Sequence, residues 1–205
     1  MEYIVMGLLG FLCGYLSDLF SLKRIPGAKQ LLGAVALGLI SYSLVMVCLK
    51  SNSLLLPLWA TWVGWLLFPL SLILLMYSLI IEIPLKKTYM ADGTGQMLIR
   101  SGTYALVRHP GVLAYALLLL SLFLVSKSEL LLIAAPVWLL VDILWVLAQD
   151  RFILDKAFPE YKSYRKETPV LFPNMDSINA FLHTFKWGGA LVGTAEGGKL
   201  NVKHD

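Results

Sequence analysis

Long apolar runs, separated by short polar intervals, dominate the pattern of this chain. Five stretches carry almost no charged side chains, and each approaches the roughly 20 residues that a helix needs to cross a bilayer. These stretches are residues 3–20, 30–49, 54–83, 111–126 and 130–149. The pattern predicts an all-α, polytopic integral membrane protein with about five transmembrane helices.

The third run is longer than one crossing requires, and Pro57 and Pro69 interrupt its hydrogen-bonding pattern. We interpret it as one helix that begins near Pro57; two short re-entrant pieces are the alternative. Only Lys127-Ser128-Glu129 separates the last two runs, which predicts a tight antiparallel hairpin.

The basic residues divide unevenly between the two sides that these helices define. Fifteen of the seventeen lysines and arginines lie in the loops after the first and third runs or after the fifth, and only Lys50 and Lys127 lie opposite. Because basic loops stay in the cytoplasm, we expect the N-terminus outside and the C-terminus in the cytoplasm. The first run lacks a basic segment before it, so it does not resemble a cleaved signal.

Composition narrows the class of protein further. The chain is 58% hydrophobic and only 15% charged, with a mean hydropathy of +0.74, which excludes a soluble or disordered protein. Its net charge of +4 reflects orientation, so membrane lipids are expected partners and nucleic acid is not. Cys13 and Cys48 lie in apolar runs, and their spacing indicates neither a metal site nor a disulfide framework.

Polar segments divide the chain into three parts. Residues 1–83 hold the first three helices, residues 84–173 form a core of loop, helical hairpin and tail helix, and residues 174–205 form a C-terminal tail. Apolar residues from Phe152 to Tyr164 recur at helical spacing, which predicts a helix on the membrane or against the loop. Phe181, Leu182, Phe185 and Trp187 suggest a short interfacial helix, followed by a Gly-rich, mobile end.

The first cluster of chemical groups is residues 98–110, directly before the fourth run. Pro110 is a favourable first residue for a helix, whose N-terminal amides attract an anion. Arg108 is suited to a carboxylate or phosphate, and His109 to proton transfer. The structural alternative is that Arg108 reaches lipid phosphates while His109 caps a loop.

The second cluster begins at Asp150, at the end of the fifth run. An acid beside the Arg108–His109 loop can accept hydrogen bonds from a ribose; the alternative is an ordinary ion pair with Arg100, Arg108 or Arg151. Asp142 lies two helical turns earlier in an apolar helix, where acids are costly and often functional. It is a candidate base, a substrate-orienting residue or a partner of a basic residue from the cytoplasmic loop; the structural alternative is a protonated acid that bonds a neighbouring helix.

Together these clusters resemble the isoprenylcysteine carboxyl methyltransferase family, to which phospholipid N-methyltransferases are distant relatives. The resemblance spans about Gln96 to Pro173. It rests on one ordered set of residues: Ser101-Gly102, Tyr104, Arg108-His109-Pro110, a hairpin, Asp150, Leu154, Phe158, Tyr161, Tyr164 and Pro169.

The resemblance implies S-adenosyl-L-methionine as cofactor, bound at the cytoplasmic face. The positions that match the family's cofactor contacts are Gln96, Met97, Leu98, Ile99, Tyr104, His109, Pro110 and Asp150. The chain also departs from the family pattern. Val112, Ala114, Val146 and Arg151 stand where Tyr, Gly, Arg and Glu are usual in that family. Because its arginine holds the substrate carboxylate, we do not expect a prenylcysteine substrate here.

We therefore expect a membrane methyltransferase that acts on a lipophilic or small thiol, carboxyl or amine acceptor. Arg108 and Asp142 are the candidates for the chemistry or for placing the acceptor. One alternative is a phospholipid N-methyltransferase, and another is a non-catalytic scaffold or transporter that retains the fold.

Overall fold

The computed structural model describes residues 1–22, 27–81 and 98–184 of the chain. Most of these residues are in helices, and their one β-bridge is an isolated pair between Ser53 and Ser128. In chain order the elements are α1 (Glu2–Leu22), α2 (Ala28–Leu49), α3 (Leu58–Met76), the π-helical turn η1 (Tyr77–Ile81), α5 (Thr103–Leu106), α6 (Pro110–Ser126), α7 (Glu129–Ala148), the π-helical turn η2 (Gln149–Leu154), α8 (Asp155–Ala157), α9 (Tyr161–Glu167) and α10 (Met175–Thr184).

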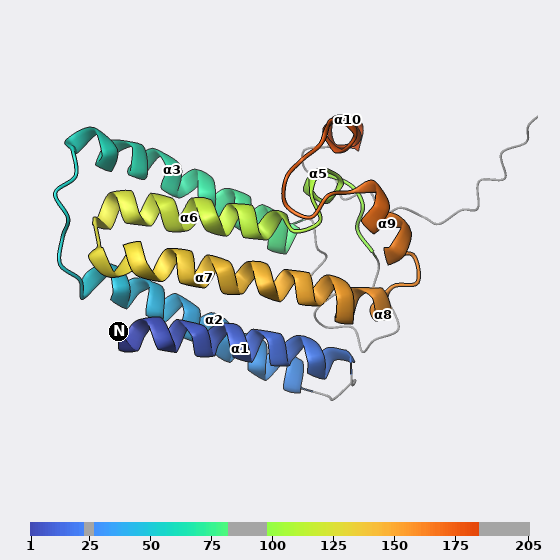
Figure 1. Ribbon diagram of the computed structural model, residues 1–205, viewed down its shortest axis with the longest axis horizontal. Helices are drawn as coiled ribbons and strands as arrows, with labels where there is room; N and C mark the ends of the chain where they lie inside the picture. Colours follow the sequence, from blue (N-terminus) through green and yellow to red (C-terminus); the bar gives the residue numbers. More distant parts are fainter. Residues whose placement is uncertain (23–26, 82–97, 185–205) are drawn as a thin grey trace, which may run out of the picture.

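Five long helices run alongside one another in Figure 1, with α7 between the α1–α2 pair and the α3–α6 pair. Side chains of α1, α2, α6 and α7 share one apolar core, in which Val47, Leu131 and Trp138 are almost fully buried. The end at which α6 begins and α7 ends is called the site end below. The smaller helices α5, α8, α9 and α10 lie there (Figure 1).

Glycines on α1 allow α7 to approach closely. A Cβ added to Gly7 would meet the Trp138 ring at 2.6 Å, and one added to Gly14 would meet the Trp145 ring at 2.5 Å. The two pairs share the same seven-residue spacing, so α1 and α7 run parallel in one register. The Trp138 indole donates to the Ile4 carbonyl at 3.1 Å, which fixes the contact.

Among the described residues, four helical segments are long and apolar enough to cross a membrane, namely Glu2–Ser21, Ala28–Leu49, Leu58–Leu79 and Glu129–Leu154. The predicted all-helical membrane class therefore agrees with the structure. The fifth predicted span, α6, is apolar but has only 17 residues. The third run forms a continuous helix through η1 in its described part, so it is not divided into two re-entrant pieces.

The predicted hairpin is confirmed. Lys127 ends α6 with a left-handed backbone (φ 57°), and Ser128 caps α7 by accepting a hydrogen bond from the Leu131 amide at 3.0 Å. Pro110 is the first residue of α6, as its fixed φ angle favours.

The tail departs from the prediction of one helix over residues 152–164. The chain extends at Phe158, because the following Pro159 disfavours helical geometry in the residue before it. The result is two short pieces, α8 and α9. The last helix begins at Met175, earlier than Phe181, and its predicted residues Phe185 and Trp187 lie outside the described residues.

Candidate functional site

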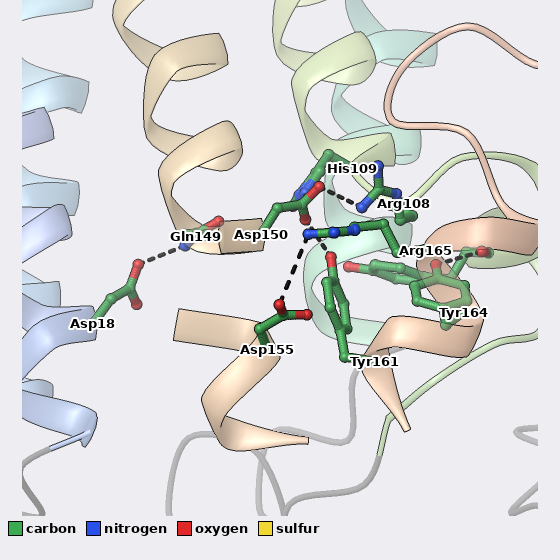
Figure 2. Close-up of polar contacts among 10 residues, drawn as sticks. Asp18, Arg108, His109, Gln149, Asp150, Asp155, Tyr161, Tyr164 and Arg165 are labelled. Carbon is green, nitrogen blue, oxygen red and sulfur yellow. Dashed lines mark hydrogen bonds and ion pairs between the residues drawn. The ribbon is translucent and has the colours of Figure 1, made fainter. Parts of the chain in front are cut away.

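Asp150 is the centre of a buried polar cluster at the site end. Its Oδ1 accepts a hydrogen bond from His109 Nε2 at 2.7 Å and another from the Tyr161 hydroxyl, and its Oδ2 lies 2.5 Å from Arg108 Nη1. Figure 2 shows these three side chains converging on the carboxylate from the loop before α6 and from α9. Two hydrogen-bond donors and the positive charge of Arg108 around one carboxylate stabilise its ionised form. The two sequence clusters therefore meet in space.

The ion pair between Arg108 and Asp150 is buried, so neither charge is stabilised by solvent. Arg108 is 7% exposed and Asp150 is 5% exposed. Arg108 Nε is also buried, and it has no hydrogen-bond partner among the described residues. A buried guanidinium donor without a partner is costly, so it marks a place where an anionic or carbonyl oxygen would be stabilised.

The π-helical turn η2 presents Asp150 to the loop. A π turn inserts an extra residue into a helix, and such turns are often found at functional sites. Gln149, which begins the turn, donates from Nε2 to Asp18 Oδ2 of α1 at 2.5 Å, and Trp145 Nε1 donates to the same oxygen at 3.0 Å. Asp18 therefore ties α1 to the turn that carries Asp150 (Figure 2).

The loop before α6 is held by Gly102 and by backbone pairing. Gly102 has φ 63° and ψ −136°, a conformation that side chains with a Cβ rarely adopt, and α5 starts immediately after it. The amides of Arg108 and His109 donate to the carbonyls of Pro169 and Val170 at 2.9 and 3.2 Å. This pairing fastens the segment before α10 to the site.

Two tyrosines of α9 close the cluster from the other side. Burial raises the pKa of Tyr161, and its hydrogen bond to the Asp150 carboxylate raises that pKa further. Burial also raises the pKa of Tyr164, whose hydroxyl donates to the Tyr104 carbonyl at 2.6 Å. Both phenols therefore stay protonated near neutral pH and act as donors.

Among the predicted cofactor residues, Tyr104 is hydrogen-bonded both to η1 and to Tyr164 of α9. Its hydroxyl donates to the Ser78 carbonyl of η1 at 3.1 Å. Leu98 and Ile99 are half-buried in the segment before α5. Gln96 and Met97 lie outside the described residues.

The predicted anion site at the amides of α6 is reduced in the structure. The Val112 amide donates to the His109 carbonyl at 3.2 Å, so it is not available to a ligand. Val112 and Val146 are themselves buried. The position at which the resembled family carries arginine is thus packed with an apolar side chain.

Asp142 lies apart from the cluster centred on Asp150. It is on α7, two helical turns before Asp150, and is 9% exposed. Within the part of the chain that the structure describes, it forms neither a hydrogen bond nor an ion pair. The nearby Tyr115 hydroxyl of α6 is buried and also lacks a partner there. The predicted interhelical hydrogen bond of Asp142 is therefore absent from these residues.

Of the three basic partners considered for Asp150, the structure selects Arg108. Arg100 instead donates from Nη2 to the Glu160 carbonyl at 2.8 Å and lies over the Tyr164 ring. Arg151 is exposed beside Phe152. The contact of Tyr161 with Asp150 was not predicted from the sequence, although the three-residue spacing of Tyr161 and Tyr164 indicates that both lie on one face of a helix.

Comparison with protein-family models, curated proteins and solved structures yields no match. The resemblance to methyltransferases therefore rests on the residues of the two clusters.

Proposed function

We propose that this chain is an S-adenosyl-L-methionine-dependent membrane methyltransferase that acts on a lipophilic or small thiol, carboxyl or amine acceptor. One observation carries the proposal. Arg108 and His109 of the first motif meet Asp150 of the second at 2.5 and 2.7 Å, in a buried cluster at one end of an apolar bundle. Motifs that are distant in the sequence have to meet in this way if they form one site.

The residues present fit the cofactor's methionyl group. The unpaired, buried Arg108 Nε suits its carboxylate, and the half-buried ring of Tyr104 suits a sulfonium cation. When bound, S-adenosyl-L-methionine supplies an electrophilic methyl group to a nucleophile. Leu98 and Ile99, with Gln96 and Met97 before them, are the candidates for the adenosyl side.

Asp150 has a different role from the one that its sequence position alone suggested. Its Oδ1 already accepts two hydrogen bonds, from His109 and Tyr161, and its Oδ2 pairs with Arg108, so a ribose hydroxyl could reach only the remaining lone pair of this buried Oδ2. We infer that Asp150 mainly orients Arg108 and His109. With Asp150 ionised, His109 Nε2 must donate to it, which leaves Nδ1 as the nitrogen that can face a ligand.

Asp142 is the candidate residue for positioning the methyl acceptor. It lies two helical turns before Asp150 on α7, and is therefore further into the proposed membrane span than the polar cluster around Asp150. A carboxylate there can orient an acceptor or remove its proton when the nucleophile arrives protonated. The buried Val146 between Asp142 and Asp150 argues against an arginine-type grip on a substrate carboxylate, which disfavours a prenylcysteine.

The membrane arrangement that we propose has five spans, with the N-terminus outside and the site end in the cytoplasm. α6 would cross as the short fourth span, because at 1.5 Å per residue its 17 residues extend for about 26 Å. A water-soluble cofactor would then reach the site from the cytosol. A lipophilic acceptor would reach it from the bilayer.

The experiment is calorimetric titration of the purified, detergent-solubilised protein with S-adenosylhomocysteine. We expect saturable binding that is weakened at least tenfold by Arg108→Ala and by His109→Ala. Arg151→Ala is the matched control, because Arg151 neighbours Asp150 in sequence but is exposed, and it should bind like the wild type.

No saturable binding by the folded wild type would refute the methyltransferase proposal and favour a scaffold or transporter. Equal affinity in Arg108→Ala, His109→Ala and wild type would refute the site. Product analysis after incubation with labelled S-adenosyl-L-methionine and a lipid extract would separate a phospholipid amine acceptor from the other classes.

A further inference from the structure

α10, the last helix that the structure describes, has an apolar stripe that no described residue covers. Met175 is 75% exposed, Leu182 is 68% exposed, and Ile178 lies between them on the same face. Phe172, three residues before α10, is 83% exposed. The inward face is different: Ser177 is buried, and α10 packs on α5. Asp176 and Asn179 form a third, polar face.

The direction of α10 differs from that of the long helices. In Figure 1 it is seen along its axis, whereas α3, α6 and α7 lie across the picture, so α10 is roughly perpendicular to the bundle. It also lies beyond the ends of α3 and α6 at the site end. If the long helices cross a bilayer, α10 lies parallel to the membrane plane at the level of its surface.

The geometry points to a membrane surface as the occupant of this stripe: α10 is an in-plane anchor whose Met175, Ile178 and Leu182 enter the lipid interface. Amphipathic helices with one apolar and one polar face bind in this orientation. Met76, at the site end of α3, is also 51% exposed, so large apolar side chains are exposed at this end of the bundle as well as on α10. The residues after α10 in the sequence, Phe185, Lys186 and Trp187, are types that suit an interface.

This anchor is connected to the polar cluster. The chain that leads into α10 supplies the carbonyls of Pro169 and Val170 to the amides of Arg108 and His109. α10 begins at a reciprocal cap, in which the Ser177 amide donates to Asn174 Oδ1 at 2.8 Å and the Asn174 amide donates to Ser177 Oγ at 3.0 Å. Lipid contact at α10 therefore holds this segment against the site.

The test is nitroxide labelling of single cysteines in the full chain, with Cys13 and Cys48 replaced by alanine, in phosphatidylcholine vesicles. Labels are placed one at a time at positions 175, 178 and 182 on the stripe and at 176 and 179 on the polar face. Collisions with oxygen report lipid, and collisions with a water-soluble nickel chelate report solvent. Leu132→Cys on α7 and Lys162→Cys on α9 are the lipid and water controls, since both positions are exposed.

We expect oxygen access to exceed nickel access at 175, 178 and 182 and the reverse at 176 and 179. High nickel access at all five positions would overturn the anchor in favour of a solvated helix. Low access to both reagents at 175, 178 and 182 would overturn it in favour of a protein cover, either residues 185–205 or a second copy. These outcomes do not depend on S-adenosylhomocysteine binding, so they are separate from the proposed activity.

Discussion

His109 Nε2 lies 2.7 Å from Asp150 Oδ1 across 41 residues of chain, and the hairpin of α6 and α7 lies between the two positions. The tight Lys127–Ser128 turn returns α7 to the end at which α6 began, so the last turn of one helix faces the first residues of the other. The geometry of the site is thus a consequence of two antiparallel helices of similar length. Arg108 and Tyr161 then complete the cluster.

Replacing Asp150 with asparagine should destabilise the protein strongly. The amide cannot balance the buried positive charge of Arg108, and removing one partner of a buried ion pair costs about 3–5 kcal/mol. Unfolding in mixed detergent micelles measures this loss. Glu160→Gln is the control: its carboxylate is 75% exposed and pairs with Arg100 at 3.4 Å, so we expect a loss of about 0–1 kcal/mol. Equal losses in the two variants would contradict the buried pair.

Tyr161→Phe should lower the free energy of unfolding more than Tyr164→Phe. Each substitution removes one buried hydroxyl and nothing else. The Tyr161 hydroxyl bonds the Asp150 carboxylate, and hydrogen bonds to charged groups contribute about 1.5–3 kcal/mol, whereas the Tyr164 hydroxyl bonds a neutral carbonyl, a bond worth about 0.5–1.5 kcal/mol. The same unfolding assay ranks them. The reverse order would show that Asp150 does not depend on Tyr161.

The sequence predicted most helix positions because apolar runs without charge have few other stable structures in a membrane. It also placed Pro110 at the start of α6 correctly, since proline at a first helical position acts locally. The end of the helix at Phe158 follows from an equally local effect, because Pro159 disfavours helical geometry in the residue before it, but it was not predicted. The start of α10 at Met175 was not predicted, because it is determined by the reciprocal cap of Asn174 and Ser177 and not by an apolar run.

The candidate site was only partly predictable from sequence. That Arg108, His109 and Asp150 belong together followed from their motifs. Which arginine pairs with Asp150 did not follow, because Arg100, Arg108 and Arg151 are equally basic and only the folded loop decides between them. The contact of Tyr161 with Asp150 depends on the turn at Pro159, which brings α9 back over η2. It also depends on the π-helical geometry of η2, which no sequence pattern predicts.

Gly7→Ala should destabilise the contact between α1 and α7. The added Cβ would lie 2.6 Å from the ring of Trp138, which is 1% exposed and cannot move aside, and overpacking of this kind costs about 1–3 kcal/mol. Gly38→Ala on α2 is the matched control. Nothing lies within 4 Å of its added Cβ, so helix propensity alone should stabilise the protein by about 0.5–1 kcal/mol. A neutral Gly7→Ala would mean that α1 and α7 are further apart.

Cysteine labelling should establish the topology. With the native cysteines replaced, a membrane-impermeant maleimide added to intact cells should modify Asn52→Cys, between α2 and α3. It should modify Lys162→Cys, on α9, only after permeabilisation. The expectation follows from the distribution of basic residues, which retains the site end in the cytoplasm. Labelling of Lys162→Cys in intact cells would show the opposite topology, with the polar cluster around Asp150 on the outside.

Asp142→Asn separates a role in catalysis from a role in packing. Asparagine keeps the size and polarity of the side chain but cannot accept a proton from the acceptor. If Asp142 orients or deprotonates the acceptor, methyl transfer should fall by about two to four orders of magnitude. The affinity for S-adenosylhomocysteine should stay unchanged, because the polar cluster around Asp150 lies two helical turns away. Asp142→Leu, which removes the polarity of the side chain as well as its carboxylate, should lower transfer at least as much. Wild-type rates in Asp142→Asn would restrict this residue to packing and direct the search for the acceptor's partner to the buried hydroxyl of Tyr115.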